Sequence, residues 1–78
     1  MTLKDVLPGK TCVVKNIYAN NLRKRIIDMG LITGTKIFVK KLAPLGDPME
    51  IVIRGYVLTL RKSEAKTIEV DLVEGLSL

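Results

Sequence analysis

The residues with the most evident binding chemistry in this sequence are three consecutive cations, Arg23, Lys24 and Arg25. Guanidinium and ammonium groups recognise carboxylates and phosphates, so the cluster predicts contact with an acidic surface. It falls in the first turn of an expected helix, where the macrodipole disfavours an exposed cation by roughly 0.3–1 kcal/mol. Asp28, four residues after Lys24, is placed to offset part of this cost.

Two explanations of Arg25 stay open. Its aliphatic stem can cover the protein core while the guanidinium bonds loop carbonyls, or the group can recognise an acidic partner. For Lys24, simple solvation is the favoured interpretation.

A second candidate binding element is the loop from Pro44 to Pro48. Two prolines and Gly46 make it stiff, and stiffness lowers the entropy lost on docking. Leu45 at its tip either plugs one end of the fold or serves as a preformed apolar contact. We predict that the loop and the cation cluster together form a partner-binding surface, with the residues Arg23, Lys24, Arg25, Pro44, Leu45, Asp47 and Pro48.

Catalysis is not expected. The sequence has no histidine, which removes the commonest general base and metal ligand. Neither serine has a suitable base beside it, and no glycine-rich phosphate loop is present. We interpret Glu64, Glu69 and Asp71 as a solvated outer face rather than a weak cation site. The prediction is no catalytic residue, no cofactor and no metal.

Composition predicts one small domain spanning residues 1–78, with a net charge of +5 and 47% apolar residues. The single cysteine, Cys12, lies in an apolar run and is expected to be a buried thiol in a reducing compartment. Lys4 and Asp5 interrupt any signal-peptide core, and no apolar stretch approaches the roughly 20 residues of a membrane span. The expected location is the cytoplasm.

These groups must be positioned by short strands and one helix. A helical turn is expected after Thr2, whose partner in a capping box is Asp5. Another turn is expected around Ser63–Lys66. The expected strands are residues 11–18, 35–42, 49–53, 56–60 and 67–72.

The expected helix runs from Asn21 to Met29. Asn20 or Asn21 is predicted to cap its start. Gly30 is predicted to end it in a left-handed conformation, with Leu31 packing back on Ile26 in a Schellman motif.

The faces of the strands follow from alternation. The pair Arg54-Gly55 predicts a two-residue hairpin turn between residues 49–53 and 56–60. In the last strand Ile68, Val70 and Leu72 are predicted to point inward. In the first strand two faces stay open, one with Cys12 and Val14 and one with Val13 and Ile17. Strands this short must roll up to bury their apolar faces, so the fold class is mainly β with one short helix, a small closed SH3-like or OB-type β-barrel.

The ordered segments DMGLITG, PLGDP and LRKSEA, at residues 28–34, 44–48 and 60–65, are similar to the FeoA family. The resemblance implies an SH3-like barrel without a catalytic site. It also implies a non-enzymatic accessory role in bacterial ferrous iron uptake, through contact with the cytoplasmic part of the membrane GTPase-transporter FeoB. Modulation of nucleotide hydrolysis, assembly of the transporter and its opening all stay open.

The alternatives are a basic nucleic-acid-binding barrel, with Phe38 among Lys36, Lys40 and Lys41, or a stand-alone repressor-type SH3-like module. Few aromatic residues accompany these cations, so no nucleic acid is expected as partner. The apolar tail Leu72–Leu78 makes self-association a further expectation.

Overall fold

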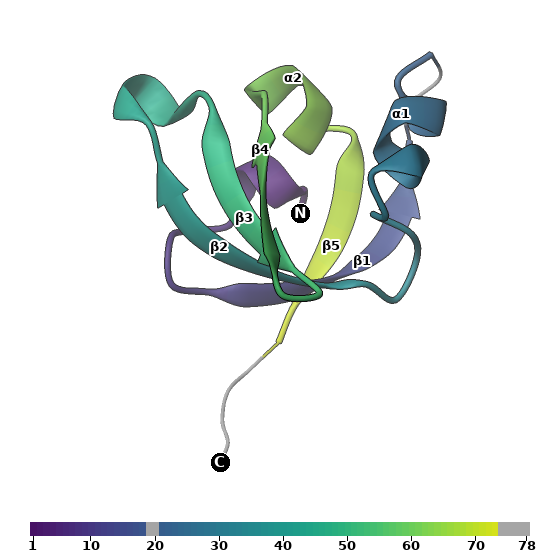
Figure 1. The fold of residues 1–78 in the computed structure, drawn as a ribbon, viewed down its shortest axis with the longest axis horizontal. Coiled ribbons are helices and arrows are strands. Elements are labelled where there is room, and N and C mark those ends of the chain that lie inside the picture. The colour runs from purple at the N-terminus through teal and green to yellow at the C-terminus, as the bar shows by residue number, and fades with distance from the viewer. Residues whose placement is uncertain (19–20, 74–78) are drawn as a thin grey trace.

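A computed structural model describes residues 1–18 and 21–73 of the chain. The fold is mainly β with short helices, as expected (Figure 1). Its elements in chain order are η1 (Leu3–Asp5), β1 (Thr11–Ile17), α1 (Arg23–Asp28), β2 (Lys36–Leu42), η2 (Pro44–Gly46), β3 (Met49–Ile53), β4 (Tyr56–Leu60), α2 (Lys62–Ala65) and β5 (Ile68–Leu72). Most of the tail on which self-association was based lies outside the described residues.

The five strands form one antiparallel sheet in the order β4-β3-β2-β1-β5, which curls strongly around its apolar face (Figure 1). The two outer strands, β4 and β5, do not pair with each other in this sheet, so the prediction of a closed barrel is wrong. Two side-chain hydrogen bonds tie α1 and the residue after it to the sheet. Tyr56 at the start of β4 donates its hydroxyl to the carbonyl of Met29, and Arg23 reaches the carbonyl of Ile17 at the end of β1.

The core is made of apolar side chains from every strand and from the segments that cover them. Burying these side chains is the main favourable contribution to folding, at about 25 cal/mol per Å² of apolar surface. The buried apolar residues are Leu3, Val6, Cys12, Val14, Ile17, Ile26, Leu31, Ile37, Val39, Met49, Ile51, Ile53, Leu60, Ala65, Ile68 and Val70.

Strand β1 buries residues from both of the faces that the sequence left open. Cys12 and Val14 point inward, and Ile17 is buried as well. A register shift against β5 lies between Val14 and Asn16, so Lys15 is the extra residue of a bulge. Because of this bulge, Val14 and Ile17 both point to the core although they are three residues apart. A similar shift against β3 makes Lys40 the extra residue of β2.

The β3–β4 hairpin confirms the predicted turn and register. Ile53 pairs with Tyr56 across Arg54-Gly55, and both turn residues have positive φ, 47° and 85°. This is the backbone that a two-residue turn between twisted strands requires.

Helix α1 is shorter than expected at its start. Leu22 occupies the N-cap position without a side-chain cap bond, so Asn21 is not the N-cap residue; Asn20, the other predicted cap, lies outside the described residues. Leu22 packs against the core, and this burial outweighs the capping preference. The end is as predicted, since the amides of Gly30 and Leu31 donate to the carbonyls of Ile27 and Ile26 in a Schellman motif.

Strand β5 differs from expectation at its last residue. Ile68 and Val70 are buried, but Leu72 is 44% exposed, so its predicted inward position is wrong. Leu72 lies at the end of the sheet away from α1 and α2, where the chain leaves the fold (Figure 1). Among the described residues, none of the helices has the length and apolar character needed to span a membrane.

Candidate functional site

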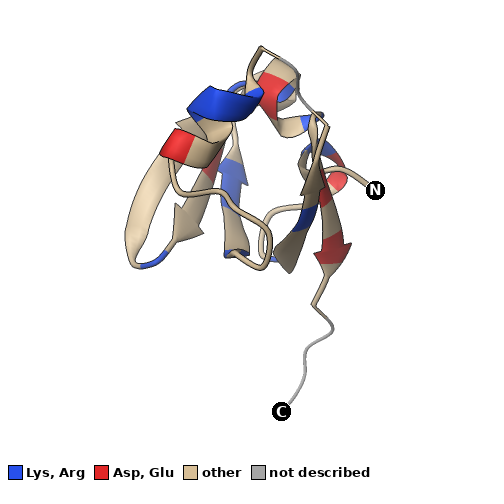
Figure 2. Cartoon of the chain, turned by 90° about the vertical axis from the view of Figure 1, so that its right-hand side faces the viewer, with Lys and Arg blue, Asp and Glu red and all other residues tan. Residues whose placement is uncertain are grey.

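Each of the three predicted binding cations has a partner within the chain. Arg23 donates from Nη1 to the carbonyl oxygen of Ile17 at 2.7 Å. Lys24 Nζ lies 2.9 Å from Asp28 Oδ2, one helical turn on, and this hydrogen bond raises the pKa of the lysine. Figure 2 shows these cations on the same short helix as the acid that ends it. The cluster is tolerated at a helix start because local acceptors offset its charge.

Arg25 pairs with a residue that the sequence analysis placed on a solvated face. Its Nε lies 2.6 Å from Glu64 Oε2, with the Arg25 side chain 66% exposed and the Glu64 side chain only 6% exposed. The second oxygen of Glu64 accepts the backbone N–H of Arg61 at 2.9 Å. The interpretation of Glu64 as solvated is therefore wrong. Its carboxylate is buried, caps the start of α2 and links α1 to α2.

The Pro44–Pro48 loop is tied to the same helix. Asp47 Oδ1 accepts the backbone N–H of Lys62 at 2.9 Å, which satisfies one free donor at the start of α2. The tip behaves differently, because Leu45 is 96% exposed and has a φ of 69°. Leu45 does not plug the fold. Of its two predicted roles, the preformed apolar contact is the one compatible with this position.

Helix α2 joins the two halves of the predicted surface. Asp47 reaches its first residue and Arg25 reaches its third, so α1, α2 and residues 44–48 lie at one end of the sheet with α2 in the middle (Figure 1). We call this region the helical end. It does not bring all predicted residues together, since Leu45 and Arg23 lie on opposite sides of α2.

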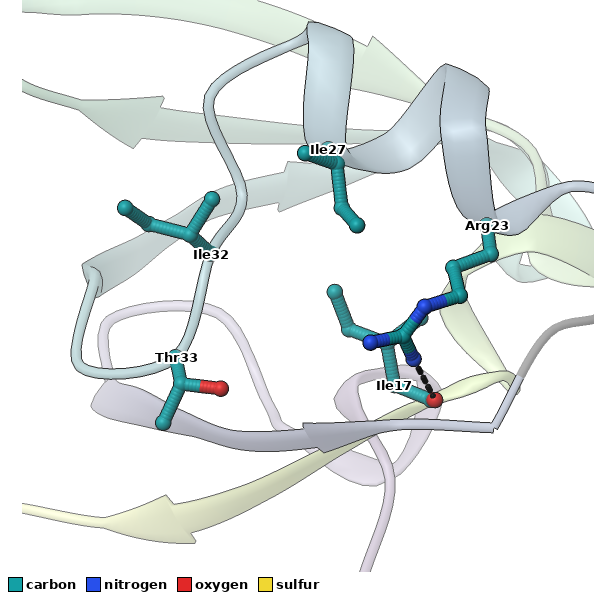
Figure 3. Close-up of a pocket in the computed structure, with 5 residues that line it drawn as sticks. All are labelled: Ile17, Arg23, Ile27, Ile32 and Thr33. Carbon is teal, nitrogen blue, oxygen red and sulfur yellow. Dashed lines mark hydrogen bonds between the residues drawn. The ribbon is translucent and has the colours of Figure 1, made fainter.

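The helical end also contains a pocket of about 310 Å³, lined by Ile17, Arg23, Ile27, Ile32 and Thr33 (Figure 3). Ile27 and Ile32 form an apolar wall and remain 37% and 44% exposed. The guanidinium of Arg23 lies across from them, beside Ile17 (Figure 3). The sequence analysis missed this pocket because three separate segments build it. The available signal was two isoleucines, Ile27 and Ile32, that flank the predicted Schellman motif without a predicted core position.

Side chains that commonly bind metal ions are scattered in the described part of the chain. No group of three or more histidine, cysteine, aspartate or glutamate side chains in this part of the chain is arranged to hold a metal ion. Cys12 is buried as predicted, and burial raises its pKa to about 11. Tyr18 donates its hydroxyl to Glu69, and this bond raises the tyrosine pKa. The arrangement can bind a partner through an apolar tip, a pocket and paired cations.

Comparison with known proteins decides the family. The family model described as FeoA domain matches residues 1–72. The chain belongs to the FeoA family.

Relatives of this FeoA chain extend the match. It is 36% identical over 76 residues to the Fe(2+) transport protein A/Fe(2+) transporter FeoB fusion protein of Porphyromonas gingivalis. That match covers 96% of this chain and 9% of the fusion protein, so this chain spans about a tenth of that relative's length.

Solved structures confirm the SH3-like fold. The NMR structure of an FeoA-like protein from Clostridium acetobutylicum is 38% identical, with a TM-score of 0.91, and the match covers 100% of this chain and 92% of that one. The zinc complex of FeoA from Stenotrophomonas maltophilia, described as a prokaryotic SH3 domain protein, is 28% identical. Its TM-score is 0.79, and the match covers 91% of this chain and 89% of that one.

Proposed function

We propose that this chain is a non-enzymatic, cytoplasmic accessory protein of bacterial ferrous iron uptake that binds the cytoplasmic part of a FeoB-type transporter. The observation that carries the proposal is the Porphyromonas relative, in which Fe(2+) transport protein A and FeoB form one polypeptide. Fusion holds two modules at high effective concentration, which favours their contact. A separate FeoA chain needs a surface that achieves the same contact by affinity.

The helical end is the surface we assign to this contact. Leu45 and Arg23 are its contacting groups, because Leu45 is exposed at a rigid tip and Arg23 borders the pocket. Arg25 and Asp47 hold the surface in shape through their bonds to α2. Lys24 adds positive charge, and Pro44 and Pro48 stiffen the loop. A preorganised surface loses less entropy when it docks.

The test is calorimetric titration of the full-length transporter in nanodiscs with purified variants of this chain. Leu45→Ala combined with Arg23→Glu is expected to weaken binding at least tenfold, about 1.4 kcal/mol. A matched control, Leu7→Ala with Lys10→Glu, changes an exposed leucine and a cation outside the helical end and should keep wild-type affinity. Binding that is unchanged in the first variant, with its circular dichroism intact, contradicts the proposal.

Salt dependence separates this function from nucleic-acid binding. Phe38 is partly exposed between Lys36 and Lys40 on the outer face of β2, which is the feature that would favour nucleic acid. Phosphate contacts weaken by about 0.9 log units per contact for each log unit of salt. A clean gel shift at low salt would support that alternative, whereas transporter binding that changes little with salt supports the proposed function.

A further inference from the structure

The curled sheet has two free edges, and they differ in protection. Along β5, the amide of Val70 donates to the carbonyl of Met1, Thr2 bridges to Glu69, and the strand carries Glu69 and Asp71. Strand β4 has the sequence YVLTL, without charge or proline, and it pairs with β3 without a bulge. Charges, prolines, bulges and covering segments are the features that keep edge strands from pairing with other chains. The residues of β4 include no charge, no proline and no bulge.

The hairpin fixes which backbone groups of β4 face outward. Ile53 and Tyr56 flank a two-residue turn, so they form a hydrogen-bonded pair, and pairing then alternates along the strands. Tyr56, Leu58 and Leu60 therefore bond to β3. The N–H and C=O groups of Val57 and Thr59 point to the free edge. In the described part of the chain β3 is the only strand paired with β4, so these four groups have no ladder partner.

Cations flank the strand at both ends. Arg54 precedes β4 in the turn, and Arg61 and Lys62 follow it. All three residues are exposed, and no ion pair to their side chains occurs among the described residues. If a second copy paired its β4 antiparallel to this one, cations would meet cations at each end. An extended segment with acidic ends matches the charge instead.

We propose that β4 is a docking edge for an extended protein segment that has a short uncharged, β-branched centre and an acidic residue at each end. The segment adds a sixth strand to the sheet. Val57 and Thr59 supply two donors and two acceptors to it. Its carboxylates pair with Arg54 at one end and with Arg61 or Lys62 at the other. This docking edge touches the helical end only at Lys62, the first residue of α2, and does not depend on the transporter proposed above.

A designed peptide tests the proposal. The probe is the blocked octapeptide Glu-Val-Thr-Val-Thr-Val-Thr-Glu, whose acids are separated like Arg54 and Arg61. Two further versions carry N-methyl groups on alternate amides, one on each edge of the extended peptide. Because only one edge of the peptide faces β4, one methylated version should bind like the parent and the other at least tenfold more weakly. A version with lysine ends should also bind at least tenfold more weakly.

The same experiment is repeated on variants of the chain. Thr59→Pro removes an outward N–H and leaves the bonds to β3 in place, since proline is tolerated where a strand edge faces solvent. Thr59→Ala keeps the N–H and is the matched control. We expect Thr59→Pro to bind the peptide at least tenfold more weakly and Thr59→Ala to bind it like the wild type. In NMR spectra of the wild type, the peptide should shift the amide signals of Val57 and Thr59 most. If Thr59→Pro does not fold, the comparison of the two methylated peptides on the wild-type chain still tests the docking edge.

Several results would overturn the docking edge. One is equal affinity for both methylated peptides, and another is no binding of the parent peptide. A third is a wild-type dimer in sedimentation that Thr59→Pro abolishes, because the occupant would then be a second copy of this chain.

Discussion

The Nε atom of Arg25 lies 2.6 Å from a carboxylate oxygen of Glu64, 39 residues further along the chain, and this pair joins α1 to α2. The same carboxylate accepts the N–H of Arg61, so one buried acid serves both as a helix cap and as a tertiary link. The helical end thus depends on a carboxylate whose loss leaves two donors, Arg25 Nε and the Arg61 N–H, without this acceptor.

Replacing Glu64 should therefore destabilise the fold more than replacing Arg25. Glu64→Ala removes the cap and the ion pair, and we expect the free energy of unfolding to fall by about 2–3 kcal/mol. Arg25→Ala should cost about 1 kcal/mol or less, because the exposed guanidinium is largely screened by water. Urea unfolding measures both. Glu64→Gln, which keeps an acceptor for Arg61, should lie between them; equal losses for Glu64→Ala and Arg25→Ala would refute the capping role.

Gly30 should tolerate a methyl group less well than Gly34. Both have φ near +90°, which costs a non-glycine residue roughly 1–2 kcal/mol. A Cβ at Gly30 would also lie 3.3 Å from the hydroxyl of Tyr56, whereas a Cβ at Gly34 meets nothing within 4 Å.

Thermal unfolding of Gly30→Ala and Gly34→Ala measures this difference. Because Tyr56→Phe removes the crowded oxygen, Gly30→Ala should cost less in that background than in the wild type. An unchanged cost there would show that backbone strain alone is responsible.

Leu45→Asn should separate binding from folding. Leu45 has a left-handed backbone, which asparagine adopts more easily than leucine, and its side chain is almost fully exposed. We expect the free energy of unfolding to stay the same or rise by up to about 1 kcal/mol, while affinity for the transporter falls. Leu22→Asn, at a leucine packed on the core, should instead destabilise the chain. A loss of stability in Leu45→Asn would assign that leucine a structural role.

Cys12 should make the free energy of unfolding depend on pH in the alkaline range. Its folded pKa is about 11, against a reference value of 9.0, because burial disfavours the thiolate. Between these two values the unfolded chain loses the thiol proton and the folded chain keeps it, so the free energy of unfolding falls as pH rises. The total effect is about 3 kcal/mol, because each of the two pKa units contributes about 1.4 kcal/mol, and the loss is complete above the folded pKa.

Unfolding curves of the wild type and of Cys12→Ala between pH 8 and 11 test this prediction, since other groups titrate alike in both. The difference between the two curves should appear above about pH 9. Rapid alkylation of native Cys12 by iodoacetamide at pH 8 would contradict the burial.

Local chemistry was predictable from the sequence. The two-residue turn at Arg54-Gly55 and the Schellman end at Gly30 need only neighbouring residues, and both are as expected. Alternation also predicted the buried positions of Ile68 and Val70 in β5. In β1 alternation failed because the strand contains a bulge. A bulge depends on the register against the neighbouring strand, and the sequence of the bulged strand alone does not reveal it.

The partners of the candidate site were not predictable in the same way. Glu64 and Arg25 are too far apart in the chain for spacing to reveal their contact. The Arg61-x-x-Glu64 spacing matched half of a capping box, but arginine in place of serine or threonine concealed it. The open barrel escaped prediction because the alternation within each strand does not show whether the two outer strands, β4 and β5, pair with each other.

The bulges of β1 and β2 have a consequence for chain length. Lys15 and Lys40 are the residues that the strand ladders skip: Val14 and Asn16 face consecutive residues of β5, and Val39 and Lys41 face consecutive residues of β3. Excising either lysine would turn a bulged strand into a regular one and keep the cross-strand pairs on both sides of the bulge. Both supernumerary positions carry a solvated positive charge, so this sheet can be shortened and made less basic by the same deletions.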